Sequence, residues 1–143
     1  MYFFHAAMHA LPAGEAPRRS VVLGGETYSS IAMPPGGMAT PWACSFEQAV
    51  EALSRLPRMF VEPDGSFVWT AAEPRWQVEG VLYDRDGRLL YVELSGRCPA
   101  ERFDELLIAL GWPAAKFAFQ LLREAVFLDE AEFRRWAAAG RTP

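Results

Sequence analysis

The sequence predicts an α+β domain built on a four-stranded antiparallel meander, with one helix before the sheet and about three helices after it, packed on the sheet. Two stretches, 58–71 and 75–96, predict the strands, because each has β-rich arms around a loop that ends in Asp-Gly. Apolar residues at helical spacing on both sides of these stretches predict the helices. At 143 residues the chain is long enough for one domain with its own core.

The helix before the sheet begins at a capping box. Ser45 can cap the helix through its hydroxyl, and Gln48 stands three residues later, where its side chain can reach back to the Ser45 N–H. Pro57 ends the helix because proline cannot continue one. The apolar residues of this predicted helix are Phe46, Ala49, Val50, Leu53 and Leu56.

The turn of the second hairpin decides which side chains share a face. A two-residue turn at 86–87 would put Glu93 on the apolar face and would require positive φ of Asp86. We favour a three-residue loop at 85–87, which separates the faces and sets Glu79 directly opposite Glu93. The apolar face then holds Trp76, Val78, Leu82, Leu90, Val92 and Leu94. The other face holds Gln77, Glu79, Val81, Tyr83, Leu89, Tyr91 and Glu93.

Three helical patterns follow the sheet. The first covers 99–110, between a proline in its first turn and a glycine after its last. The second covers 114–127. The third covers 129–139 and opens with Asp129 and Glu132, which we interpret as a second capping box.

Residues 1–45 show the weakest pattern and are rich in glycine and proline. We expect this region to pack on or wrap the body of the domain, residues 46–143. Two alternatives stay open for it: short strands at 20–23 and 27–33 around Gly24-Gly25, or irregular chain throughout.

Composition narrows the classes of function and the cellular locations that we expect for this protein. The net charge of −4 and two small arginine pairs, at 18–19 and 134–135, argue against nucleic-acid binding. No apolar run approaches the ~20 residues that a membrane span needs. The widely separated Cys44 and Cys98 suit a reducing compartment, so we expect a cytoplasmic protein. Abundant arginine and alanine, one lysine and no asparagine are typical of a GC-rich bacterial genome.

Three groups of residues are candidates for chemistry. Glu79 and Glu93, if opposite, could share a proton or a cation, although a solvated or arginine-bridged pair is the interpretation we favour. Cys98 precedes a helix and could be a reactive thiol, although a packed cysteine is more common. His5 and His9 stand four residues apart and could ligate a metal if helical, although two ligands do not make a site.

The face that carries the two glutamates is also aromatic. We expect either that residues 1–45 or the last helices cover it, or that it is an exposed binding surface. The chain has no catalytic signature, so we expect a non-catalytic protein-binding or assembly module without a cofactor, whose partner is a protein or a second copy. The alternative is a small enzyme that uses Cys98 or the glutamate pair. The predicted binding surface consists of Val81, Tyr83, Leu89, Tyr91, Glu79 and Glu93.

Overall fold

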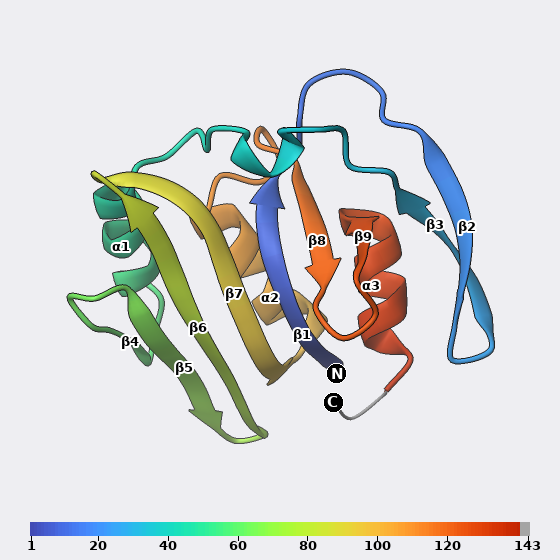
Figure 1. Ribbon diagram of the computed structural model, residues 1–143. Helices are drawn as coiled ribbons and strands as arrows, with labels where there is room; N and C mark the ends of the chain where they lie inside the picture. The colour runs from blue at the N-terminus through green and yellow to red at the C-terminus, as the bar shows by residue number, and fades with distance from the viewer. Residues whose placement is uncertain (141–143) are drawn as a thin grey trace.

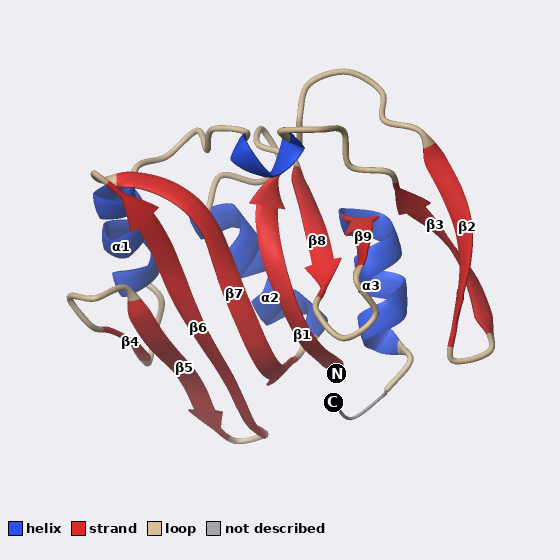
Figure 2. Ribbon diagram, in the orientation of Figure 1, coloured by secondary structure: helices blue, strands red, loops and turns tan. Residues whose placement is uncertain are grey.

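The computed structural model describes residues 1–140. In these residues a single sheet of nine antiparallel strands has the order β2-β3-β9-β8-β1-β7-β6-β5-β4 (Figure 1, Figure 2). The strands are β1 Tyr2–Ala10, β2 Arg18–Leu23, β3 Glu26–Ile31, β4 Met59–Val61, β5 Ser66–Ala72, β6 Arg75–Arg85, β7 Arg88–Cys98, β8 Phe117–Leu121 and β9 Val126–Asp129. The helices are α1 Phe46–Ser54, α2 Ala100–Ala109 and α3 Glu130–Ala138, with a short 3-10 turn η1 at Gly37–Ala39.

The three α-helices all lie on one face of the sheet, behind the strands in Figure 1. We call the opposite face, which is turned toward the viewer, the open face. The segment that includes η1 passes across the ends of the central strands (Figure 1), and beyond η1 its Trp42 Nε1–H donates to the Leu90 carbonyl of β7 at 3.0 Å. The molecule therefore has two layers, one of strands and one of helices, and the middle of the open face carries no helix within residues 1–140.

Four phenylalanines join the central strands to the helices. Phe4 of β1 and Phe119 of β8 point to the helix layer, and there they meet Phe103 of α2 and Phe133 of α3. The rings of Phe119 and Phe133 stack with centroids 4.2 Å apart, and those of Phe4 and Phe103 are 5.5 Å apart. All four side chains are fully buried. Aromatic burial of this extent holds α2 and α3 against the centre of the sheet.

The expected four-stranded meander with one helix before it and about three after it is wrong. Strands β4 to β7 do form a meander, but they are one end of a nine-stranded sheet. The largest omission is β1, which pairs with β7 on one side and β8 on the other. Both faces of β1 are buried over most of its length, so it lacks the alternation that identifies a half-exposed strand.

The helix expected over 114–127 is also wrong. The structure has a hairpin there, β8 and β9, joined by a turn in which Ala125 has φ 58°. The residues of this stretch are good helix formers, and local preference alone favours a helix. Pairing with β1, for example Met8 with Phe119, supplies strand contacts from a distant part of the chain and overrides that preference.

The helix starts were predicted more accurately. The capping box of α1 is confirmed, with Gln48 N–H donating to Ser45 Oγ and Ser45 N–H donating to Gln48 Oε1. At α3 only half of the expected box forms, because Asp129 caps the Glu132 N–H at 2.8 Å while the Glu132 carboxylate turns elsewhere. That carboxylate accepts a hydrogen bond from the backbone N–H of Ser29 in β3.

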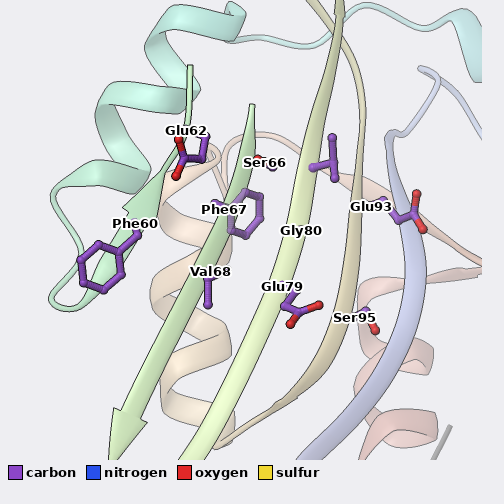
Figure 3. A pocket seen from close by; sticks show the side chains of 10 residues that line it. Phe60, Glu62, Ser66, Phe67, Val68, Glu79, Gly80, Glu93 and Ser95 are labelled. Carbon is purple, nitrogen blue, oxygen red and sulfur yellow. The ribbon is translucent and has the colours of Figure 1, made fainter. Parts of the chain in front are cut away.

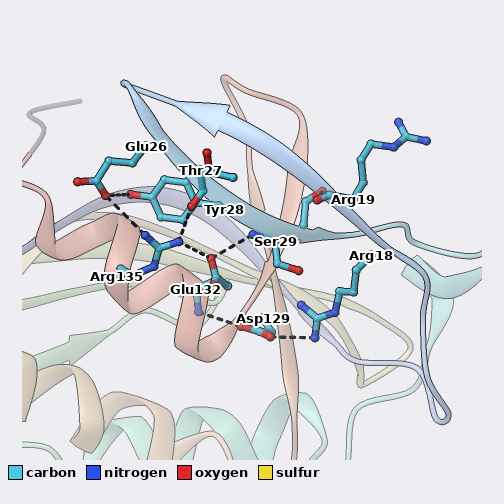
Figure 4. A network of polar contacts seen from close by, with 10 residues as sticks. Arg18, Arg19, Glu26, Thr27, Tyr28, Ser29, Asp129, Glu132 and Arg135 are labelled. Carbon is cyan, nitrogen blue, oxygen red and sulfur yellow. Dashed lines mark hydrogen bonds and ion pairs between the residues drawn. The ribbon is translucent and has the colours of Figure 1, made fainter.

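The hairpin of β2 and β3 corresponds to the alternative of short strands at 20–23 and 27–33, although β2 begins two residues earlier and β3 ends two residues earlier, and α3 holds the hairpin in place (Figure 4). The Arg135 guanidinium lies over the Tyr28 ring at 4.1 Å and donates to the Thr27 carbonyl at 2.7 Å. Arg18 of β2 forms an ion pair with Asp129 at 2.9 Å. This edge of the sheet is therefore anchored by charged contacts in addition to strand pairing.

The register of β6 and β7 differs from the expected one. The turn is the two-residue Asp86-Gly87, in which both residues have positive φ. A β-bulge then shifts the register, so that Tyr83 pairs with Tyr91 whereas Asp84 pairs with Leu89. The extra residue reverses the alternation once, which returns Glu93 to the open face despite the shorter turn.

Candidate functional site

The open face gathers five of the six residues predicted as a binding surface. Val81, Tyr83, Tyr91, Glu79 and Glu93 all lie on it, on β6 and β7. The sixth, Leu89, was assigned to the wrong face. The bulge turns Leu89 into the helix layer, where it is 3% exposed, and leaves its neighbour Leu90 outside at 37%.

A line of ring side chains crosses the open face from β6 to β9. Tyr83 stacks on Tyr91 with centroids 4.5 Å apart, and Tyr91 stacks on His9 of β1 at 5.5 Å. His9 in turn meets the edge of Phe127 of β9 at 5.7 Å. Between β1 and β9, strand β8 places only the small Ala118 opposite His9, which leaves room for the larger rings to meet.

His9 is buried within this line, at 2% exposure. Its Nε2 lies 3.1 Å from Oε1 of Gln120, and donation from this nitrogen leaves Nδ1 as an acceptor. Burial lowers the pKa of His9, and the hydrogen bond to Gln120 opposes that shift only partly. His9 is therefore a neutral part of the packed surface at neutral pH.

Glu93 lies next to the stacked rings. The Tyr83 hydroxyl donates to Glu93 Oε2 at 3.3 Å, and His5 Nε2 lies 3.3 Å from Oε1 of the same carboxylate. The negative charge of Glu93 is the main cause of the raised pKa of Tyr83, since it disfavours the phenolate. The cluster therefore places a carboxylate beside ring side chains, and it is partly open to solvent.

The two glutamates are not directly opposite each other. Glu79 pairs with Ser95, and Glu93 pairs with Val81, so the carboxylates lie on a diagonal of the open face. Glu79 accepts a hydrogen bond from Gln77 Nε2 at 2.7 Å. Within residues 1–140 neither carboxylate forms an ion pair with an arginine or a lysine. The expected face-to-face pair, which would have coupled their protonation, is replaced by two separate carboxylates.

Both glutamates line a hollow of about 340 Å³ between β4 and β7 (Figure 3). Its walls combine apolar side chains with a third carboxylate, that of Glu62, and with serine hydroxyls. Phe60 stands at the rim and is 66% exposed, and its strand partner Val68 is 37% exposed, so the two form a contiguous exposed apolar surface. The residues that line this hollow are Phe60, Glu62, Ser66, Phe67, Val68, Glu79, Gly80, Val81, Glu93 and Ser95.

The other candidate residues lie apart from this surface. Cys98 ends β7 and is fully buried on the helix side, while Pro99 takes the N-cap position of α2. Burial raises the pKa of the Cys98 thiol to about 12, opposite to the direction expected for a reactive thiol. The thiol is therefore protonated at neutral pH and packs as an apolar group.

The two histidines share the open face but not a single binding point. They lie four residues apart on a strand, which separates their Cα atoms by roughly 13 Å. His5 is exposed, whereas His9 is enclosed by rings. In the described part of the chain no group of three or more His, Cys, Asp or Glu side chains is placed to hold a metal ion. None of the helices there is long and apolar enough for a membrane crossing.

Several residues of the surface were missed from the sequence. Phe60, Glu62 and Val68 come from the first hairpin, for which no faces were predicted. Val68 stands between two other apolar residues, Phe67 and Trp69. Alternation along β5 was the signal that could have found Val68.

Comparisons of the chain with protein-family models, with curated proteins and with solved structures find no match.

Proposed function

We propose that the chain is a non-catalytic protein-binding or assembly module whose binding surface is the middle of the open face. The observation that carries this proposal is the hollow of about 340 Å³, in which exposed Phe60 and half-exposed Val81 adjoin three carboxylates that form no ion pair with an arginine or a lysine within residues 1–140. Aromatic side chains are enriched at protein interfaces, where they anchor the contact. Such a surface suits a partner that brings apolar contacts together with a guanidinium or ammonium group.

The alternative of a small enzyme finds less support. Cys98 is buried and its thiol pKa is raised, and the two glutamates lie diagonally and hydrogen-bond to different residues. Neither arrangement supplies an activated nucleophile or a coupled acid–base pair. We further propose a cytoplasmic location, which is supported by the two cysteines being free thiols.

The test is an affinity capture that compares two charged substitutions. Phe60→Asp places a charge on the open face, and Ile108→Asp places one at a similarly exposed position on α2, on the other side of the molecule. We expect purified wild-type protein and Ile108→Asp to retain the same partner, including a second copy of the chain, and Phe60→Asp to lose it. Equal retention by both variants would show that the open face is not the binding surface.

A further inference from the structure

A second hollow adjoins the acidic one along the strands and carries the opposite charge. It has a volume of about 370 Å³ and is lined by two arginines, Arg75 of β6 and Arg97 of β7. Both arginines are exposed, and in the part of the chain that the structure describes neither forms an ion pair, a hydrogen bond through its side chain or a cation–π contact. Ser95 lines both hollows, so the two lie side by side.

The charges on the open face are therefore ordered along the strands. On β6 the basic end at Arg75 is followed four residues later by Glu79, and on β7 Arg97 is preceded by Glu93 at the same spacing. Because β6 and β7 are antiparallel, both gradients point in the same direction, with the arginines at one end. Four residues separate the Cα atoms of opposite charge by roughly 13 Å along each strand, whereas Arg97 and Glu79 are diagonal neighbours across the two strands.

This order is self-complementary. Two copies that meet face to face around a two-fold axis, lying in the interface across the strands, place the basic end of each copy over the acidic hollow of the other. Each guanidinium is then brought to the side of the partner that carries carboxylates, the groups that arginine binds through paired hydrogen bonds. The apolar Phe60, Val68 and Val81 lie on the same face and supply the contact that excludes water.

We propose that the occupant of the open face is a second copy of this chain, docked so that Arg75 and Arg97 of each copy face the acidic hollow of the other. This proposal rests on the proposed function and names its partner. A partner with basic charge alone satisfies the carboxylates but is repelled by the two arginines, whereas the chain itself satisfies both. A standard interface needs about 800 Å² from each partner, which is about a tenth of the 7885 Å² that one chain exposes.

Charge reversal tests the proposal in solution. Arg97→Glu and Glu79→Arg each place like charges opposite each other in the docked pair, and each is measured by analytical ultracentrifugation over about 1 to 100 µM. We expect wild-type protein to sediment with twice the 16.0 kDa mass of the chain, and each single variant to associate at least about tenfold more weakly. An equimolar mixture of the two single variants is expected to form a heterodimer, and the double variant Arg97→Glu with Glu79→Arg a homodimer.

Two control variants carry the same changes in net charge at exposed positions away from the open face. Arg19→Glu lies on the edge strand β2, at the other end of the sheet from β4, and Glu15→Arg lies in the loop that precedes β2. Both are expected to form dimers as wild-type protein does. Loss of the dimer in the controls as well would show that net charge governs association, which overturns the docked arrangement.

Two further results would overturn the proposal. One is a wild-type chain that stays at the mass of a single copy over the whole concentration range. The other is a dimer that neither single reversal weakens. A monomeric chain that captures a different protein, and loses it in Phe60→Asp, would reject the second copy as occupant while leaving the proposed function in place. Loss of both dimerisation and face-dependent capture would reject the two together.

Discussion

Leu89 and Leu90 are adjacent in the chain but lie on different faces of the sheet, Leu89 in the helix layer and Leu90 toward solvent. The β-bulge between β6 and β7 causes this separation, because it inserts one residue at the point where the alternation reverses. The same bulge keeps Glu93 on the open face. The binding surface thus depends on a local irregularity of a single strand.

The bulge predicts unequal costs for two similar substitutions. Leu89→Ala removes buried methyl groups and is expected to lower the free energy of unfolding by about 2–5 kcal/mol. Leu90→Ala changes a partly exposed side chain and is expected to cost less than about 1 kcal/mol. Urea unfolding followed by circular dichroism measures both. A larger loss for Leu90→Ala would mean that the bulge lies elsewhere.

Gly96 of β7 predicts a backbone clash. It has φ 127°, and a Cβ at this position would collide with the carbonyl oxygen of Gln77. Gly87 also has positive φ but has nothing within 4 Å of the corresponding point. We therefore expect Gly96→Ala to lower the free energy of unfolding by about 2 kcal/mol more than Gly87→Ala, which carries only the left-handed strain. Equal losses in chemical denaturation would contradict the close approach.

Burial of neutral His9 predicts a loss of stability in acid. Its pKa is lowered in the folded chain, so the unfolded chain takes up a proton first as the pH falls below the unfolded value of about 6.5. The contribution of His9 is complete above that pH and is lost as the pH falls through the folded pKa. His9→Phe retains a ring between Tyr91 and Phe127 without titrating.

The measurement is the free energy of unfolding of wild-type protein and His9→Phe between about pH 7 and pH 5. The difference between the two proteins is expected to move in favour of His9→Phe as the pH falls, with His5 present in both. Parallel pH profiles would show that His9 does not resist protonation in the folded state.

The raised thiol pKa of Cys98 predicts slow alkylation. In a Cys44→Ser background, native protein at about pH 8 is expected to react with iodoacetamide at least about a hundredfold more slowly than the same protein in denaturant. Burial limits both the thiolate population and access to the sulfur. Mass spectrometry at timed intervals gives both rates, and rapid modification of native protein would revive the reactive-thiol hypothesis.

The carboxylate of Glu93 is expected to control the pH at which its neighbour Tyr83 ionises. Because the carboxylate charge raises the phenol pKa, Glu93→Gln is expected to let Tyr83 ionise at lower pH. Subtracting the ultraviolet titration of Tyr83→Phe from that of each protein isolates this one phenol among the four tyrosines. An unchanged midpoint in Glu93→Gln would mean that the carboxylate does not face the hydroxyl.

Local sequence determined the parts of this protein that depend on near neighbours. The start of α1 at Ser45 needs only Gln48 three residues later, and the side chains of 77, 79, 81 and 83 share a face because a strand alternates wherever it lies. The segregation of Val81 and Tyr83 with Glu79 was therefore predictable. The turn at 62–65, with Gly65 at φ 94°, also follows from its own residues.

Tertiary structure decided the rest, because strand pairing joins segments that are distant in the chain. Strand β1 is a strand because residues 92–98 and 117–121 flank it, and β8 is one because β1 holds it. The two hollows form only where β4 to β7 lie together, and the order of their charges follows from the register of β6 against β7. A one-residue bulge changes that register, and its free energy depends on the packing of both layers rather than on local preference.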